Sequence, residues 1–281
     1  MGSSRRYTTC MPLRLLFARM ALALALIGAP SAAIAENDSF DHITRAGVVR
    51  VAVPDNFPPF GDLGPDGKLQ GYDIDTAVLI AKGLGVELEL VPVSSTGRLP
   101  YLRSGKVDLL ISSLGHDAAR EKVIDFSIAY APFFSAIFGP EHLAVAKPED
   151  LASKSIAVTR ATIEDSALTT IAPDTTTITR YDDNAATEVA YLSGQAELIA
   201  TANFTAAEIL AKSPLKKTAI KFVLQSSPCY IGIPKGELRL LGRVNQIIAA
   251  ARNDGSLSKI SELWLKAPLG DPEHPEGITH K

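Results

Sequence analysis

The segment VVRVAVPDNFPPFGDLGPDGKLQGYDID, residues 48–75, joins three elements of local structure. Its β-branched run VVRVAV at residues 48–53 predicts a buried strand. Pro58 and Pro59 stop the extended run, and the stretch rich in glycine and proline around them predicts turns. Aspartate is common at the start of helices, so Asp73 predicts a helix start. The segment therefore predicts a strand, a turn region and a helix, in that order.

Strand and helix patterns alternate along the rest of the chain. We expect strands at residues 48–53, 86–93 and 107–112 in the first half, and at residues 155–159, 175–179 and 197–201 in the second half. Helical spacing marks Ile74, Ala77, Val78 and Ala81, and also residues 185–192. This alternation is typical of parallel βαβ units, whose ligand sites form at the carboxyl ends of the strands. Because the pattern occurs twice, we predict an α/β protein with two lobes.

The C-terminal part of the chain is helical by the same criterion. The spacing of a core-facing helix holds for Leu240, Val244, Ile247, Ile248 and Ala251, and Leu257, Ile260 and Trp264 continue it. The tail from Leu269 is rich in acids and prolines, so we expect it to be frayed.

The N-terminal 35 residues are typical of a secretory signal peptide. They contain four arginines and no acid, an apolar run from Met20 to Ile27, and the small-residue exit Ala33-Ile34-Ala35. The apolar run is shorter than the roughly 20 residues that cross a membrane, so we expect cleavage after Ala35. An uncleaved N-terminal anchor is the alternative.

Charge and cysteine content limit the classes of function. Removal of residues 1–35 takes away four of the 28 basic residues and none of the 31 acidic residues, which leaves a net charge of −7. This charge disfavours a nucleic-acid partner. Cys10 lies in the expected leader, so Cys229 is the one cysteine of the mature chain and no intramolecular disulfide is expected.

Residues 37–266 resemble the family 3 extracellular solute-binding proteins, the polar amino acid receptors of bacterial ABC transporters. The resemblance is specific in the first strand, in SSLGHDAAREKVIDFS at residues 112–127, and in the C-terminal helices. It implies a type II periplasmic binding protein fold, in which each lobe is a mostly parallel sheet flanked by helices. Two chain crossings, near residues 131–134 and 226–229, would form the hinge.

The same resemblance implies the organisation of the chain and its partners. The signal peptide would cover residues 1–35, the first lobe residues 36–133, the second lobe residues 134–228, and a return to the first lobe residues 229–281. The protein would be a periplasmic, monomeric receptor without cofactor or metal. Its lobes would close on a small carboxylate-bearing ligand and present it to an inner-membrane ABC permease.

By this resemblance, Arg120 is the clamp for the α-carboxylate of the ligand. The Ser113 hydroxyl and the backbone amide of Gly115, where the family commonly has Ser or Thr, would be further donors. A guanidinium can donate two parallel hydrogen bonds to a carboxylate, which lysine cannot. The alternative is a surface arginine paired with Asp117 or Glu121. Asp117 would repel a carboxylate that it faced, so we expect it to cap the following helix.

Two more positions of the first lobe match ligand contacts of the family. Phe57 corresponds to an aromatic residue over the ligand side chain, with a core phenylalanine as the alternative. The second aromatic wall falls on Ser95, which leaves that side open or polar. Arg98, in SSTGRLPYL at residues 94–102, corresponds to an arginine that binds the side-chain carboxylate in glutamate and aspartate receptors. A solvated loop arginine is the alternative.

The resemblance is partial in the second lobe. The Gly-Thr-Thr turn of the family falls on Ala161, Thr162 and Ile163, so only the hydroxyl of Thr162 remains. The aspartate that accepts from the ligand's ammonium falls on Ala202. Asn203 is the best substitute that we find, because its amide can accept or donate. We therefore expect a carboxylate-bearing ligand, amino acid or not.

The sequence lacks several motifs that are typical of enzymes. The sequence has no Gly-x-Ser-x-Gly turn, phosphate-binding glycine loop or histidine pair at metal spacing, and Asp73-Ile74-Asp75 matches a structural element of the family. We therefore expect no enzyme. The alternative is a lyase similar to the cyclohexadienyl dehydratases, which share the fold and remove water and carbon dioxide from a carboxylated ring. It would need an acid to protonate the leaving hydroxyl, for which we nominate Glu164, although a capping or solvated Glu164 is the simpler interpretation.

Overall fold

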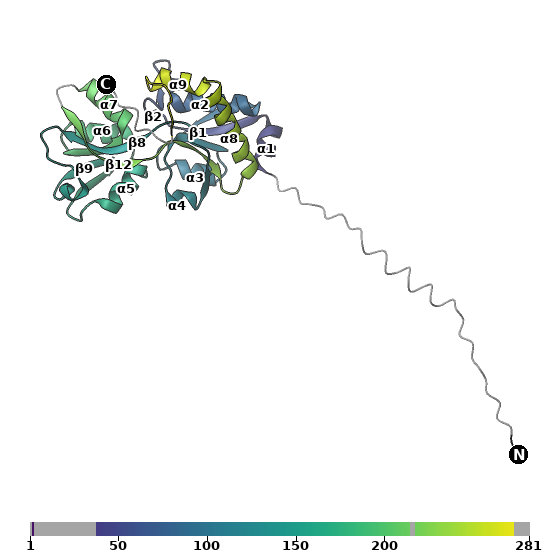
Figure 1. Cartoon of the computed structure of the whole chain (residues 1–281), viewed down its shortest axis with the longest axis horizontal. Coiled ribbons are helices and arrows are strands. Elements are labelled where there is room, and N and C mark those ends of the chain that lie inside the picture. Colours follow the sequence, from purple (N-terminus) through teal and green to yellow (C-terminus); the bar gives the residue numbers. More distant parts are fainter. Residues whose placement is uncertain (1, 3–37, 214–216, 273–281) are drawn as a thin grey trace. The chain divides into compact units, whose positions relative to one another are not determined.

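The computed structural model describes residue 2, residues 38–213 and residues 217–272. Apart from residue 2, the expected signal peptide lies outside this range, as do residues 273–281 of the tail. From Asp38 onward the described chain forms two five-stranded sheets and one small three-stranded sheet (Figure 1). We call the part built on each five-stranded sheet a lobe. None of the described helices combines the length and the hydropathy of a membrane-spanning segment.

The first lobe is built on a sheet with the strand order β5-β1-β6-β13-β7. Its strands are β5 (Glu87–Pro92), β1 (Val48–Val53), β6 (Leu109–Leu114), β13 (Tyr230–Pro234) and β7 (Ile124–Phe126). Its helices are α1 (Ser39–Ala46), α2 (Tyr72–Leu84), α3 (Arg98–Arg103), α4 (Ala118–Glu121), α8 (Leu238–Asn253) and α9 (Ser256–Trp264). The small sheet contains β2 (Asn56–Phe57), β3 (Gly61–Leu63) and β4 (Leu69–Gln70). Thus C-terminal residues complete a sheet and a helical layer that N-terminal residues begin.

The second lobe is built on a sheet with the strand order β10-β9-β11-β8-β12. Its strands are β10 (Thr177–Tyr181), β9 (Ser155–Thr159), β11 (Leu198–Ala202), β8 (Phe134–Pro140) and β12 (Thr218–Ser226). Its helices are the 3₁₀ turn η2 (Pro148–Leu151), α5 (Ile163–Ile171), α6 (Asn184–Leu192) and α7 (Asn203–Lys212).

The parallel strands of both lobes confirm the predicted βαβ units. β1 runs parallel to β5 and β6, and β9 runs parallel to β10 and β11. β13 and β8 are antiparallel to their neighbours. β1 and β9 have the predicted bounds because each is a short β-branched run, buried on both faces over most of its length. The carboxyl ends of the parallel strands lie at one edge of each sheet, which is where ligand sites form in such folds.

Two segments connect the lobes and lie side by side. One leads from β7 to β8 and the other from β12 to β13. Cys229 donates its amide to the carbonyl of Ala131 over 2.9 Å, and Tyr130 donates its amide to the carbonyl of Cys229 over 2.8 Å. The two connections therefore form a short antiparallel bridge at the expected hinge.

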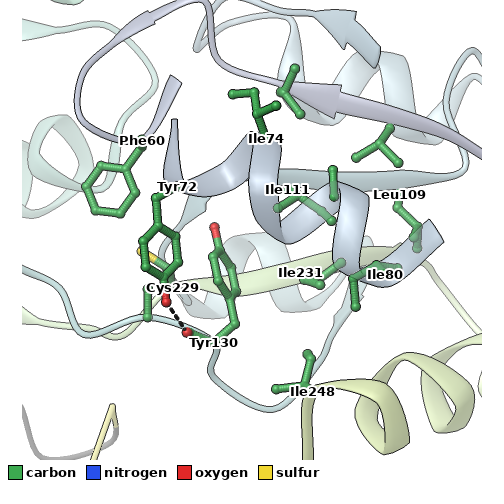
Figure 2. Packing of buried hydrophobic residues seen from close by; sticks show 14 of the residues in the cluster. Phe60, Tyr72, Ile74, Ile80, Leu109, Ile111, Tyr130, Cys229, Ile231 and Ile248 are labelled. Atoms are coloured by element: carbon green, nitrogen blue, oxygen red, sulfur yellow. Dashed lines mark hydrogen bonds between the residues drawn. The ribbon is translucent and has the colours of Figure 1, made fainter. Parts of the chain in front are cut away.

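The core of the first lobe reaches this bridge. The Tyr72 hydroxyl at the start of α2 donates to the carbonyl of Tyr130 over 2.8 Å, and the ring of Phe60 meets that of Tyr72 edge-on (Figure 2). Tyr72, Tyr130 and Cys229 are fully buried. Apolar packing therefore anchors one end of the connection in the first lobe.

Several expectations about the bounds of elements and the burial of residues were wrong. β10 begins at Thr177 rather than at 175, and Val78 of α2 is exposed. α8 ends at Asn253, and Gly255 takes a left-handed conformation with φ +77° that starts α9 as a separate helix, which periodicity alone did not reveal. Leu269 is not frayed, because it is only 5% exposed and packs in the core of the first lobe.

Candidate functional site

A pocket lies between the two lobes at the carboxyl ends of their strands. Six of the seven residues predicted to bind a ligand line it: Phe57, Arg98, Ser113, Gly115, Arg120 and Thr162. Three residues that we did not predict also line it: Thr159, Asn184 and Thr201. Their position at or just after the carboxyl ends of β9, β10 and β11 is the signal that could have found them.

Arg120 is buried, and its guanidinium is partly occupied by the protein. Its Nε lies 3.0 Å from a carboxylate oxygen of Asp117, Nη1 donates to the carbonyl of Gly115 over 2.8 Å, and Nη2 donates to the carbonyl of Ala161 over 3.1 Å. A guanidinium has five N–H donors, so one remains on each terminal nitrogen. Arg120 does pair with Asp117, as the alternative interpretation expected, but it is not a surface residue.

Asp117 has the capping role that we predicted. Its side chain accepts from the amides of Ala119 and Arg120 at the start of α4. This short helix and its cap place the Arg120 side chain against the pocket.

Arg98 opens α3 and is buried beside the pocket. It is 7% exposed, and its Nε has no hydrogen-bond partner within the described part of the chain. Burial lowers the pKa of Arg98 to about 10, and the nearby charge of Arg120 adds to this effect. The interpretation of Arg98 as a solvated loop residue was wrong, because the first turn of α3 packs it inside.

Ser113, the residue before the end of β6, has a strained conformation with φ +44°. Its hydroxyl donates to Asp73 over 2.7 Å, and the Tyr130 hydroxyl donates to the other oxygen of Asp73 over 2.5 Å. The proton that we expected Ser113 to offer a ligand carboxylate is therefore directed to Asp73. The lone pairs of the Ser113 oxygen remain as acceptors.

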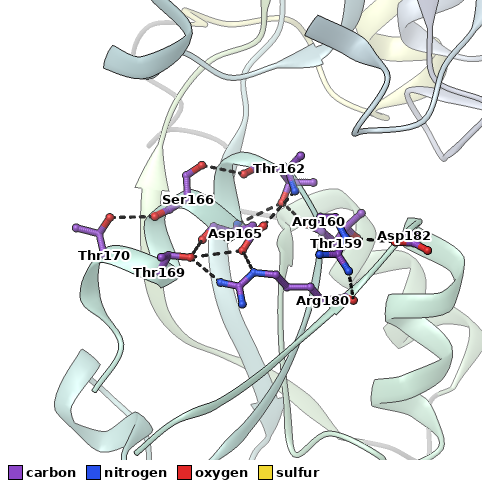
Figure 3. A network of polar contacts seen from close by, with 10 residues as sticks. Thr159, Arg160, Thr162, Asp165, Ser166, Thr169, Thr170, Arg180 and Asp182 are labelled. Carbon is purple, nitrogen blue, oxygen red and sulfur yellow. Dashed lines mark hydrogen bonds and ion pairs between the residues drawn. The ribbon is translucent and has the colours of Figure 1, made fainter. Parts of the chain in front are cut away.

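Thr162 caps α5 and belongs to a polar network at the start of this helix (Figure 3). Its hydroxyl donates to the carbonyl of Thr159 over 2.8 Å and accepts from the amide of Asp165. Asp165 in turn pairs with Arg180 of β10 over 2.7 Å. These contacts fix the first turn of α5, which carries Glu164 into the pocket.

Glu164 is a buried acid in the pocket. It is 5% exposed, and burial raises its pKa. Its own backbone amide and the charges of Arg120 and Arg98 act in the opposite direction. The interpretation of Glu164 as a solvated residue was therefore wrong.

Gly115 and Ile163 meet across the pocket. A Cβ atom at position 115 would lie 2.4 Å from Cδ1 of Ile163. The two departures from the family pattern are therefore complementary, because the isoleucine occupies the space that a serine or threonine at 115 would need.

Phe57 has both of the roles considered for it. It lines the pocket and also stacks on Phe60 of the core, with 5.5 Å between the ring centres. Asn203 is the predicted residue that the pocket does not include. It is buried at the start of α7, and its side-chain oxygen has no partner within the described part of the chain.

Hydrogen bonds across the pocket join the two lobes. In addition to the bond from Arg120 to Ala161, the side-chain amide of Asn184 donates to the carbonyl of Asn56 over 3.4 Å. The lobes are therefore in contact in this structure. Within the described residues, no group of three or more His, Cys, Asp or Glu side chains could hold a metal ion.

Comparison with known proteins identifies the family. Residues 49–267 match the model of the bacterial extracellular solute-binding proteins, family 3. The chain belongs to this family. A family 3 solute-binding protein has the two-lobe type II fold that the two sheets and the double connection display.

Three curated relatives show the range of the similarity. The L-cystine-binding protein TcyJ of Escherichia coli (strain K12) is 29% identical, over 88% of this chain and 94% of the relative. The ABC transporter glutamine-binding protein GlnH of Bacillus subtilis (strain 168) is 26% identical, over 74% of this chain and 77% of the relative. The cyclohexadienyl dehydratase of Pseudomonas aeruginosa is 30% identical, over only 39% of this chain and 41% of the enzyme.

Among solved structures, the P235GK mutant of the arginine-binding protein ArgBP from T. maritima is similar in fold. Its TM-score is 0.75 with 28% identity, and the match covers 81% of this chain and 99% of that chain. This coverage of the two chains agrees with the family assignment.

Proposed function

We propose that this protein is the periplasmic substrate-binding component of an ABC importer and that it captures a small carboxylate-bearing solute, an amino acid or a related organic acid. Family membership and relatives named as amino-acid-binding proteins support the class of function. The observation that carries the ligand class is the pair of buried arginines, Arg98 and Arg120, at one pocket between the lobes. Both retain N–H groups without a partner in the described chain.

The lobe boundaries and the mode of action follow from this proposal. Residues 36–133 and 229–281 form one lobe, residues 134–228 form the other, and the bridge between Ala131 and Cys229 is the hinge. A ligand that contacts both lobes stabilises the closed arrangement. The monomer then delivers the ligand to an inner-membrane permease.

Calorimetric titration tests the proposal. The protein is first freed of co-purified ligand by unfolding and refolding, and is then titrated with L-glutamate, L-aspartate, L-glutamine, L-arginine, L-cystine and the desamino dicarboxylates glutarate and succinate. We expect saturable one-to-one binding of at least one of these compounds. Absence of binding to all of them would contradict the proposal.

One observation favours a second candidate function. Glu164 is a buried pocket acid whose raised pKa suits a general acid, which the dehydratase-like lyase would need. Incubation with a hydroxylated cyclohexadiene carboxylate separates the two candidates, because a lyase consumes the compound over time whereas a receptor only binds it. Turnover that is lost in Glu164→Gln would establish the lyase.

A further inference from the structure

Charges of opposite sign line the pocket on its two sides. Arg98 and Arg120 come from the first lobe, and Glu164 comes from the second. Within the described chain, Glu164 is the one acidic residue of the pocket lining. With Glu164 ionised, the site is therefore dipolar rather than simply positive.

The protein does not neutralise Glu164 directly. The ion pair of Arg120 is made with Asp117, and no salt bridge joins Glu164 to Arg98 or Arg120 in the described residues. A buried carboxylate without a close cation is costly. A ligand that brings its own cation to Glu164 would remove this cost.

A second acceptor of the pocket is Ser113. Because its hydroxyl proton goes to Asp73, its oxygen offers only lone pairs to the pocket. An ammonium group has three donors and no acceptor, so a carboxylate and a hydroxyl oxygen that can only accept suit it. Ser113 belongs to the first lobe and Glu164 to the second, so a cation between them would connect the lobes.

We propose that Glu164, with the Ser113 oxygen as second acceptor, binds the ammonium group of a zwitterionic ligand whose carboxylate binds the arginines. This inference rests on the proposed receptor function. Glu164, at the start of α5, then has the role that we expected for Asn203, a residue that does not line the pocket. The ligand class is then an amino acid rather than a simple organic acid.

Pairs of probes that differ only in the ammonium group test this assignment. The pairs are L-glutamate with glutarate, L-glutamine with glutaramate, and L-arginine with 5-guanidinopentanoate. Calorimetry gives the affinity ratio within each pair for the unmodified protein, Glu164→Gln, Ser113→Ala and Glu149→Gln. Glu149 is an exposed glutamate of the same lobe and provides the matched control. Circular dichroism melting shows whether each variant is folded.

We expect the unmodified protein to bind at least one amino acid ten or more times more tightly than its desamino partner. Glu164→Gln should reduce that ratio at least tenfold, Ser113→Ala should reduce it less, and Glu149→Gln should leave it unchanged. A purely structural Glu164 would weaken both members of a pair equally, which would overturn the inference. Equal or tighter binding of the desamino compounds by the unmodified protein would also overturn it, while the receptor function would stand. Binding of no probe would remove both.

Discussion

The guanidinium of Arg120 uses part of its N–H donors within the protein, so only the others can bind a ligand. It is held by Asp117, Gly115 and Ala161, and the N–H groups that remain on its two terminal nitrogens can reach one carboxylate. Arg120→Ala should weaken binding of the best ligand from the calorimetric panel by more than roughly 1.5 kcal/mol, which is more than tenfold. Arg103→Ala, at an exposed arginine of α3, is the control. Retained affinity in Arg120→Ala would remove its assigned role.

The charge of Arg98 should lower the stability of the ligand-free protein and increase its affinity for an anionic ligand. A buried guanidinium whose Nε has no partner costs free energy, and methionine fills a similar volume without charge. At pH 5, where Asp73 is mostly protonated, Arg98→Met should raise the free energy of unfolding of the ligand-free protein by about 1 kcal/mol or more. It should also lower the affinity for L-glutamate.

Urea unfolding at pH 5 and calorimetry measure these two effects. A less stable Arg98→Met would show that Arg98 contributes to the fold through its charge. Unchanged affinity for L-glutamate would show that Arg98 does not contact this probe.

Titration of Asp73 should make the stability of the folded protein depend on pH. Burial raises its pKa from 3.8 to about 6, although hydrogen bonds from Tyr130 and Ser113 oppose this rise. The folded protein therefore holds this proton more tightly than the unfolded chain, so the stability contributed by Asp73 is full below about pH 4 and is lost as the pH rises through 6. The difference corresponds to about 3 kcal/mol.

Comparison with Asp73→Asn isolates this effect. The free energy of unfolding of the unmodified protein, minus that of Asp73→Asn, should fall by about 2.4 kcal/mol between pH 4 and pH 7, which is most of the full contribution. Urea titrations at each pH measure the difference. A difference that stays constant with pH would mean that Asp73 does not titrate in this range.

At the scale of elements, the loop after β6 and the start of α5 fit each other. Gly115 leaves room for Ile163, and a side chain at 115 would meet its Cδ1 atom. Gly115→Ser should therefore weaken ligand binding by about 1–3 kcal/mol, because the added atoms oppose contact between the lobes. The double variant Gly115→Ser/Ile163→Thr, which restores the family residue types, should recover most of this loss.

A double-mutant cycle by calorimetry measures the coupling of the two positions. Additive effects would show that the two residues do not restrict each other in the ligand-bound protein.

For the whole molecule, contact between the lobes should depend on the ligand. Arg120 and Asn184 already donate hydrogen bonds to the opposite lobe, and a bound ligand adds contacts to both. Ligand at 100 times its Kd should raise the free energy of unfolding by about 2.7 kcal/mol. The radius of gyration measured by small-angle X-ray scattering should decrease at the same time. Binding without such a decrease would contradict closure about the hinge.

The class of fold could be predicted from the sequence, because strand and helix periodicities are local properties. The bounds of β1 and β9 and the core-facing residues of α8 were all predicted from such patterns. Most candidate site residues could also be chosen from the sequence, since carboxyl ends of parallel strands converge and the family resemblance marked them.

The contacts and protonation of these residues, in contrast, depend on the packing of the folded chain. Ser113 and Asp73 are 40 positions apart, and nothing local indicates that one gives its proton to the other. The burial of Glu164 and the position of Asn203 outside the pocket depend on how α5 and α7 pack. The physical reason is that a side chain's burial, partners and charge state arise from distant segments, whereas its tendency to form a helix or strand arises from its neighbours along the chain.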